Sequence, residues 1–214
     1  MSDGFEWDIE GGEVESPEEL HQGVGMSKPG MYHFEIVKFE TECTSQEEMD
    51  EGKTPRLVCT MQCLQGDNED QIGKMTTQRV FLMRKDKENG GVMPLDDRGL
   101  KSLRSFAYAF GVISSDEVSQ AKLKIQWGKL LQAQAIGKVQ YSEPRKYTAG
   151  DGEEKTTNEA WEVKWTSDFW NLADEKMRLV PKDFEAMTMF VAKSGGAVPA
   201  GGSGGGSDEL DDLL

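Results

Sequence analysis

Apolar and polar residues alternate along five stretches of the chain, a spacing of two that is typical of half-buried β-strands. The first stretch, residues 31–40, places Tyr32, Phe34 and Ile36 on one face. The turn-forming run Gln65-Gly66-Asp67-Asn68 joins the second stretch to the third, so the first three predict an antiparallel meander. The other four predicted strands cover residues 56–64, 72–83, 130–141 and 159–166.

Between the third and fourth strands, apolar residues recur at helical spacing. Asp97 offers an N-cap and Gly111 a stop, so a helix is predicted between them. Ser114 and Glu117 form a capping box, which predicts a second short helix. The first helix carries an apolar stripe of Leu100, Leu103, Ala107 and Phe110. Its opposite face is interpreted as solvated, with phosphate contact as the alternative, and carries Arg98, Lys101 and Arg104.

A last apolar stripe predicts a helix over residues 181–193, which Pro181 opens. This helix is expected to cover an end of the sheet or to form a subunit contact. The acid-rich stretch 41–55 is expected to be a long polar loop.

The order of these elements favours a mainly β fold, an OB-like five-stranded barrel. One or two helices are expected between strands three and four, with a C-terminal helix and disordered acidic termini. Composition divides the chain further, because glycine-rich and charge-rich segments cannot build a core. The predicted divisions are an acidic N-terminal arm (1–29), the OB-like domain (30–193), a flexible Gly/Ser-rich linker (194–207) and an acidic tip (208–214).

Charge is segregated along the chain. Residues 71–148 hold 14 Lys and Arg against 7 Asp and Glu, although the whole protein has a net charge of -15. Residues 1–70 hold only 4 basic residues against 18 acidic ones. A surface that needed only solubility would intersperse its charges, so the segregation favours a middle region that meets a polyanion. Chance clustering is the alternative interpretation.

The basic region interleaves cations with aromatic rings, the combination that holds phosphates and stacks bases. Arg79 and Phe81 share one face of the third predicted strand, although an ordinary half-buried edge strand would look similar. A second cluster lies at the end of the fourth strand and in the loop beyond it. The predicted phosphate contacts are Lys74, Arg79, Arg84, Lys138, Arg145 and Lys146, and the predicted stacking residues are Phe81, Tyr141, Tyr147 and Trp165.

Motifs for catalysis are absent from the sequence. It has no Walker lysine motif, no cysteine pair at zinc spacing and no HExxH. Cys59 and Cys63 lie four residues apart on one face of a predicted strand, so they are expected in the core. These features predict a binding protein rather than an enzyme, with no catalytic residue, metal or cofactor. A metal-dependent nuclease built on carboxylates is a third hypothesis.

The sequence also bears on localisation. No run approaches the roughly 18 apolar residues of a membrane span, and the first residues are acidic where a signal peptide would be basic. Three cysteines without a dense framework fit a reducing compartment. The prediction is a soluble, cytoplasmic protein without membrane contact.

Several short motifs, in their order along the chain, resemble those of phage-type single-stranded DNA-binding proteins. They are Gly30-x-Tyr32-x-Phe34-x-Ile36, Leu100-x-x-Leu103-x-x-Phe106-Ala107 before Gly111, Gly137-x-Val139, and the glycine-rich linker with its acidic tip. The resemblance covers roughly residues 30–170 and the last 20.

The resemblance implies cooperative or multi-site coating of single-stranded DNA in phage replication or recombination, and leaves room for a homo-oligomer. It also implies a tail that competes with DNA for its groove and recruits replication or recombination proteins. The tail residues are Asp208, Glu209, Leu210, Asp211, Asp212, Leu213 and Leu214. Many such tails end in an aromatic residue, whereas this one ends in two leucines, so the tail's partner is left open. The alternative is an acidic interaction protein or DNA mimic that binds a basic protein.

Overall fold

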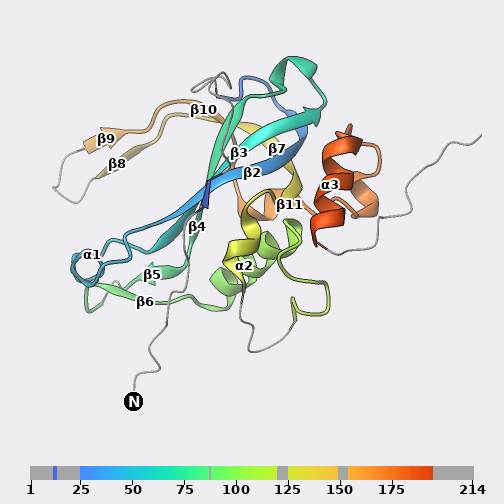
Figure 1. Cartoon of the computed structure of the whole chain (residues 1–214). Helices are drawn as coiled ribbons and strands as arrows, with labels where there is room; N and C mark the ends of the chain where they lie inside the picture. Colours follow the sequence, from blue (N-terminus) through green and yellow to red (C-terminus); the bar gives the residue numbers. More distant parts are fainter. Residues whose placement is uncertain (1–11, 14–24, 87, 120–124, 149–153, 195–214) are drawn as a thin grey trace, which may run out of the picture.

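The five predicted strands pair into one antiparallel sheet (Figure 1). The structure is a computed structural model, and it describes residues 12–13, 25–86, 88–119, 125–148 and 154–194. The strand order of the sheet is β10-β7-β2-β3-β4, with β1 added beside β2 and β11 beside β7. The bounds are Gly12–Glu13 (β1), Gly30–Glu42 (β2), Arg56–Gly66 (β3), Met75–Phe81 (β4), Gln134–Ser142 (β7), Ala160–Val163 (β10) and Phe169–Trp170 (β11).

The mainly β prediction is confirmed, and β2, β3 and β4 form the expected meander. The sheet does not close. Its end strands β4 and β10 have Cα atoms within 8 Å of each other, yet no ladder joins them among the described residues. The closed barrel that the strand order suggested is therefore not present in the described part of the chain.

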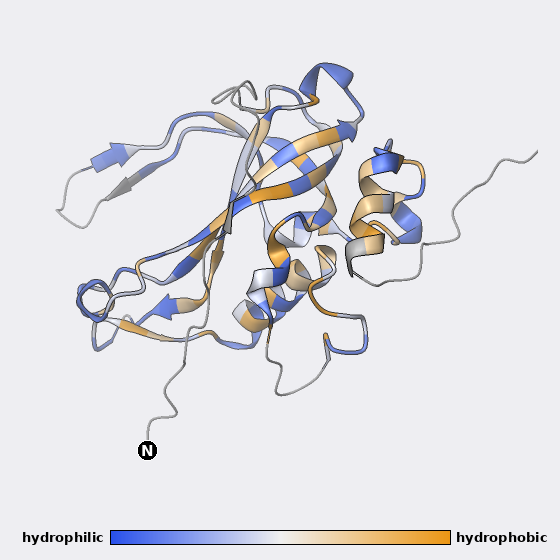
Figure 2. Ribbon diagram, in the orientation of Figure 1, coloured by the Kyte–Doolittle hydropathy of each residue, from blue (hydrophilic) through white to orange (hydrophobic). Residues whose placement is uncertain are grey.

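The core lies on the inner face of the sheet, where Tyr32, Phe34 and Ile36 are fully buried, as their spacing predicted. Gly137 faces Phe34 so closely that an added Cβ would lie 2.9 Å from its ring. Cys59 and Cys63 are buried free thiols, which confirms them as core residues. Burial raises the pKa of both thiols, that of Cys63 to about 12. Figure 2 shows hydrophobic residues gathered where the sheet meets the helices.

Helix α2 (Asp97–Ala109) covers this core with Phe106, Ala107 and Ala109. Its N-cap is Asp96, one residue before the predicted Asp97, because the Asp96 side chain accepts a hydrogen bond from the Gly99 N–H. The predicted stop is confirmed. Gly111 adopts φ +67°, and the Val112 N–H donates to the Ala107 carbonyl at 2.9 Å, as in a Schellman motif.

The second helix expected after Gly111 is not formed in the described residues. Ser114 and Glu117 make the predicted capping contact, with the Ser114 N–H donating to Glu117 Oε2 at 2.7 Å. Residues 115–119 nevertheless form turns, and a capping box alone cannot sustain a helix that lacks a following apolar stripe. The chain then passes through a 3₁₀ turn, Trp127–Leu130 (η2), so β7 begins four residues later than predicted.

Short elements occupy regions that were expected to be loops. Helix α1 (Gln46–Asp50) lies within the polar stretch 41–55, where Ser45 and Glu48 form a capping box. Two small hairpins project from the sheet: β5 (Met83–Lys85) with β6 (Val92–Pro94), and β8 (Lys146–Thr148) with β9 (Glu154–Thr156). Further 3₁₀ turns are Glu69–Gln71 (η1), Thr166–Asp168 (η3) and Glu175–Met177 (η4). Elements of this length carry too little periodicity for sequence patterns to detect.

Helix α3 (Phe184–Ser194) packs beside β7 and β11, on the side of the sheet away from the two hairpins (Figure 1). It begins three residues after Pro181, because Asp183 accepts a hydrogen bond from the Ala186 N–H. The Asp183 N–H in turn donates to Nδ1 of the buried His33, whose Nε2 lies 3.1 Å from Oε1 of Gln134. Gln134 also donates to the Ala186 carbonyl. This network fastens the start of α3 to the sheet.

Candidate nucleic-acid interface

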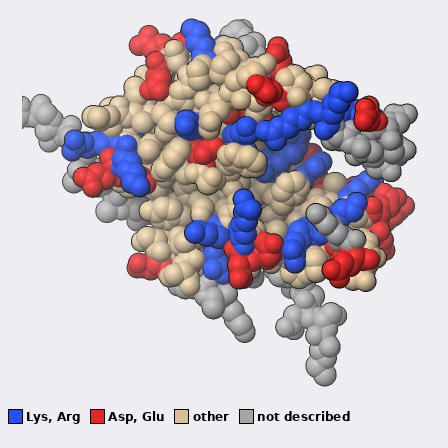
Figure 3. Space-filling view, turned by 180° about the vertical axis from the view of Figure 1, so that it is seen from behind, with Lys and Arg blue, Asp and Glu red and all other residues tan. Residues whose placement is uncertain are grey.

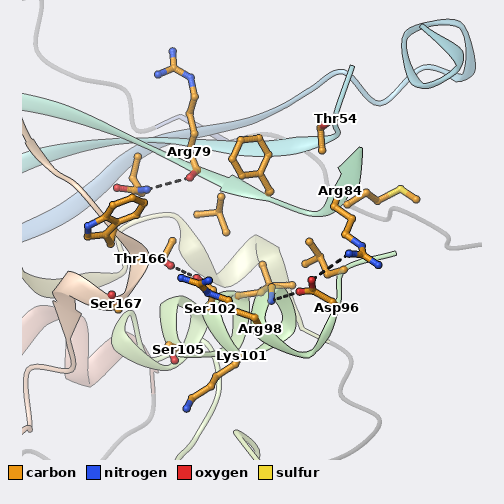
Figure 4. Close-up of a pocket in the computed structure, with 18 of the residues that line it drawn as sticks. Thr54, Arg79, Arg84, Asp96, Arg98, Lys101, Ser102, Ser105, Thr166 and Ser167 are labelled. Atoms are coloured by element: carbon orange, nitrogen blue, oxygen red, sulfur yellow. Dashed lines mark hydrogen bonds and ion pairs between the residues drawn. The ribbon is translucent and has the colours of Figure 1, made fainter. Parts of the chain in front are cut away.

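A groove of about 890 Å³ lies between the end of β4 and β5 on one side and α2 with residues 164–167 on the other (Figure 4). Three separate stretches of the chain, residues 78–85, 95–105 and 164–167, build it together with Thr54. Six of its lining residues are Lys or Arg and one is acidic, Asp96. The basic residues are Arg79, Arg84, Lys85, Arg98, Lys101 and Lys164. Lys and Arg thus outnumber acidic residues in the lining of the groove, although the whole protein has a net charge of -15.

Two aromatic rings stand at this groove with much of their surface open to solvent. Phe81 is 52% exposed and Trp165 is 56% exposed. Phe81 lies on the exposed face of β4, the face that also carries Arg79, and Arg56 lies directly opposite it on β3. Lys164 Nζ is 6.0 Å from the centre of the Trp165 ring, within range of a cation–π contact. Both rings offer a face on which an unpaired base can stack.

Trp165 is held from both sides. It precedes the turn η3, and the Thr166 hydroxyl shares a hydrogen bond with the Ser102 hydroxyl of α2. Asp168 in the same turn accepts a hydrogen bond from Gln140 of β7 at 3.2 Å. Because α2 and β7 are both anchored in the core, these contacts fix the position of the Trp165 backbone at the rim of the groove.

The cations of the groove have different orientations. Arg84 reaches across from β5 toward the start of α2, where its NH1 lies 3.2 Å from Asp96 Oδ2 (Figure 4). Arg98 and Lys101 are exposed and lie one helical turn apart on α2, and Figure 4 shows the Lys101 side chain directed away from β4. Figure 4 shows the Arg79 side chain directed away from α2, while its carbonyl accepts a hydrogen bond from Gln78. Arg79 therefore lines the groove with its backbone and carries its charge to the outer side of β4.

Only part of the predicted site belongs to this groove. The lining residues include Arg79, Phe81, Arg84 and Trp165. Lys74 precedes the opposite end of β4 and donates to Ser27 Oγ at 2.7 Å. The structure does not bring the other predicted residues to the groove, and they are Lys138, Tyr141, Arg145, Lys146 and Tyr147.

Most of this second set belongs to a projecting arm, defined here as the hairpin β8–β9 with the adjoining residues 141–145 and 157–161. Tyr141 packs against Trp161 with the two rings tilted by 55° and their centres 5.2 Å apart, and its hydroxyl donates to Glu159 at 2.6 Å. This hydrogen bond raises the pKa of Tyr141. Arg145 and Lys146 are exposed, and Tyr147 pairs with Lys155 in the hairpin. Lys138 is exposed on β7 beyond the arm.

Sequence reasoning missed several groove residues. Arg98 and Lys101 were interpreted as a solvated helix face, and Lys85 and Lys164 were not among the predicted phosphate contacts. The available signal was the spacing of three between Arg98 and Lys101 opposite the apolar stripe of α2. Figure 3 shows Lys and Arg side chains across the rear face and toward the side of the hairpins, with Asp and Glu mainly near its edges.

The predicted tail residues 208–214 lie outside the described part of the chain, as does most of the N-terminal arm. Among the described helices, none is both long and apolar enough to cross a lipid bilayer. In the described residues no cluster of three His, Cys, Asp or Glu side chains could hold a metal ion. No protein-family model matches this chain, and no curated protein sequence matches it either.

Proposed function

We propose that this protein binds single-stranded nucleic acid, DNA in the first instance, along the groove between β4, β5, α2 and residues 164–167. The observation that carries the proposal is the pairing of two exposed rings, Phe81 and Trp165, with a strong excess of Lys and Arg around one hollow. Lys and Arg side chains alone would bind any polyanion. Exposed rings among them favour a polyanion with unpaired, stackable bases.

The energetic argument has two parts. Each base stacked on an aromatic ring contributes roughly 1–3 kcal/mol by alanine substitution. Each phosphate neutralised by Lys or Arg releases counterions, so log affinity falls with log salt at about -0.7 per contact for a single strand. With three or four contacts in the groove, we expect a slope of about -2 to -3.

The strand order supports the same proposal. The meander β2-β3-β4, with β7 paired to β2 and β10 paired to β7, follows the connectivity of an OB-like sheet. In that arrangement, oligonucleotides bind over the second and third strands, and loops flank the site. Here β4 carries Arg79 and Phe81 on the corresponding outer face, and the arm stands at its side. We include coating of phage DNA during replication or recombination, and recruitment through residues 208–214, in this proposal.

The test is fluorescence anisotropy of a labelled oligo-dT strand titrated with the full chain at low and moderate salt. We expect saturable binding that weakens with salt, and weaker binding of a duplex of equal length. An RNA strand of the same sequence would report the sugar preference. A full chain that binds none of these strands at low salt, yet binds a basic protein, would replace the proposal with the alternative of an acidic interaction protein.

A further inference from the structure

Asp96 occupies the point of the groove where two kinds of donor converge. Its Oδ1 accepts the Gly99 N–H of the first turn of α2 at 2.9 Å. Its Oδ2 lies 3.2 Å from NH1 of Arg84, whose Nε donates to the Pro94 carbonyl. The carboxylate therefore bridges a strand cation and a helix N-terminus. Its side chain remains 53% exposed to solvent, within reach of anything that enters the groove.

This carboxylate is also the one acidic group among the residues that line the groove. A phosphate of a bound strand would seek the same guanidinium, because Arg binds phosphate and carboxylate oxygens with the same geometry. It would also meet the negative charge of Asp96 at short range. A strand that contacts Arg84 must therefore exchange one ion pair for another, which yields little net free energy.

We infer that Asp96 is a built-in competitor for phosphate, which lowers the affinity of the groove for the strand. The inference rests on the proposed function and adds to it the residue that limits affinity. In the unbound protein the Asp96 carboxylate neutralises Arg84. The ion pair keeps Arg84 from neutralising a strand phosphate, so the unchanged chain makes one phosphate contact fewer than a chain without this carboxylate charge, while Asp96 caps α2 through Gly99.

The test compares Asp96→Asn with the unchanged full chain in the oligo-dT titration. Asn retains the N-cap, because Asn and Asp are about equally good in that position. Removing the charge frees Arg84 for phosphate, so we expect roughly tenfold tighter binding at low salt and a salt slope steeper by about 0.7. The slope separates this role from a purely structural one, which would leave the number of released counterions unchanged.

Asp97→Asn is the matched control. Asp97 is the next residue, also exposed and acidic, but it does not line the groove. It should change affinity less than about twofold, because solvent and salt screen charges outside the contact. In an Arg84→Met background the gain from Asp96→Asn should largely disappear, as a double-mutant cycle would report. Asp96→Ser, which also caps the helix, provides a second variant if Asp96→Asn folds poorly.

Unchanged or weaker binding by both Asp96 variants, with the unchanged chain binding normally, would overturn the inference, because Asp96 would then assist the site. An equal gain from Asp97→Asn would also overturn it, since only net charge would matter. Failure of the unchanged chain to bind any strand would instead reject the proposed function itself.

Discussion

The groove and the arm both combine aromatic rings with Lys and Arg, yet their rings are in different states. In the groove, Phe81 and Trp165 are more than half exposed, at 52% and 56%. In the arm, Tyr141 is 41% exposed, packs on Trp161 and donates its hydroxyl to Glu159. The rings of the groove are therefore available to a ligand, whereas the Tyr141 ring of the arm already has partners within the protein.

The difference concerns how each region is assembled. The arm follows a local cluster in the sequence, whereas the groove gathers β4, β5, α2 and residues 164–167 through the fold. A local cluster can satisfy its own polar and apolar groups within a hairpin. In a groove between several elements, the lining side chains face solvent and remain open to contact with another molecule. We therefore expect the groove to dominate strand binding and the arm to contribute mainly electrostatic attraction.

The largest expected effect comes from removing both rings of the groove. Substituting Phe81→Ala and Trp165→Ala together should weaken oligo-dT binding by about thirtyfold or more, since each stacked base is worth roughly 1–3 kcal/mol. Leu179→Ala is the control, because Leu179 is the most exposed large apolar side chain among the described residues and lies away from the groove. Equal losses in the control and the double variant would show that exposed apolar surface in general, and not the groove, drives binding.

The next prediction concerns His33, which lies outside both the groove and the arm. Its titration should change the free energy of unfolding without altering the groove. Burial lowers the pKa of His33 to about 4 from its ordinary 6.5. His33 accepts the Asp183 N–H, and Asp183, Lys182 and Glu35 are the charged groups around it. The neutral ring is thus favoured by folding. The neutral His33 ring contributes its full stabilisation above pH 6.5. As the pH drops toward 4 this contribution is lost, which lowers the free energy of unfolding by on the order of 3 kcal/mol.

Urea unfolding at pH 7 and pH 5 measures this loss. In His33→Asn, which cannot titrate, the difference in the free energy of unfolding between the two pH values should shrink. A wild-type protein equally stable at both values would contradict the buried neutral histidine.

A smaller effect compares cations of the two regions. Arg98→Gln with Lys164→Gln should weaken strand binding about tenfold, roughly 1.4 kcal/mol, and should lower the magnitude of the salt slope by about 1.4. The matched pair, Arg145→Gln with Lys146→Gln, removes the same charge from the arm and should cost less than about threefold. A larger loss from the arm pair would reverse the ranking of the two regions.

The smallest expected effect is at Tyr141. Tyr141→Phe keeps the ring on Trp161 and removes only the hydrogen bond to Glu159, so strand affinity should stay within about twofold of the wild type. A large loss of affinity would mean that the hydroxyl contacts the strand directly, and the arm would then belong to the binding site.

Much of the fold follows from residue patterns. The alternation of Tyr32, Phe34 and Ile36 predicts a buried strand face, and Gly111 predicts the end of α2, because both depend on local geometry. The capping box at Ser114 predicted a helix that the described residues do not form. Capping fixes where a helix can start, but packing of an apolar face decides whether it persists.

Only those groove residues that lie close together in the sequence could be predicted from it. Arg79 and Phe81 were found because both lie on one strand, and Arg84 follows directly. Their neighbours Arg98 and Lys164 come from other elements, and only the fold brings them to the same groove. The sequence also grouped Tyr141 with the site, because residue spacing reveals neither its packing against Trp161 nor its hydrogen bond to Glu159.

The most direct test of the central claim is ultraviolet cross-linking of the full chain to an oligo-dT strand, with mapping of the linked peptides by mass spectrometry. If the groove holds the strand, cross-links will concentrate in residues 79–85 and 164–167, and they will disappear at high salt. Cross-links confined to residues 138–148, or a strand that links nowhere in the groove while binding tightly, would contradict the account.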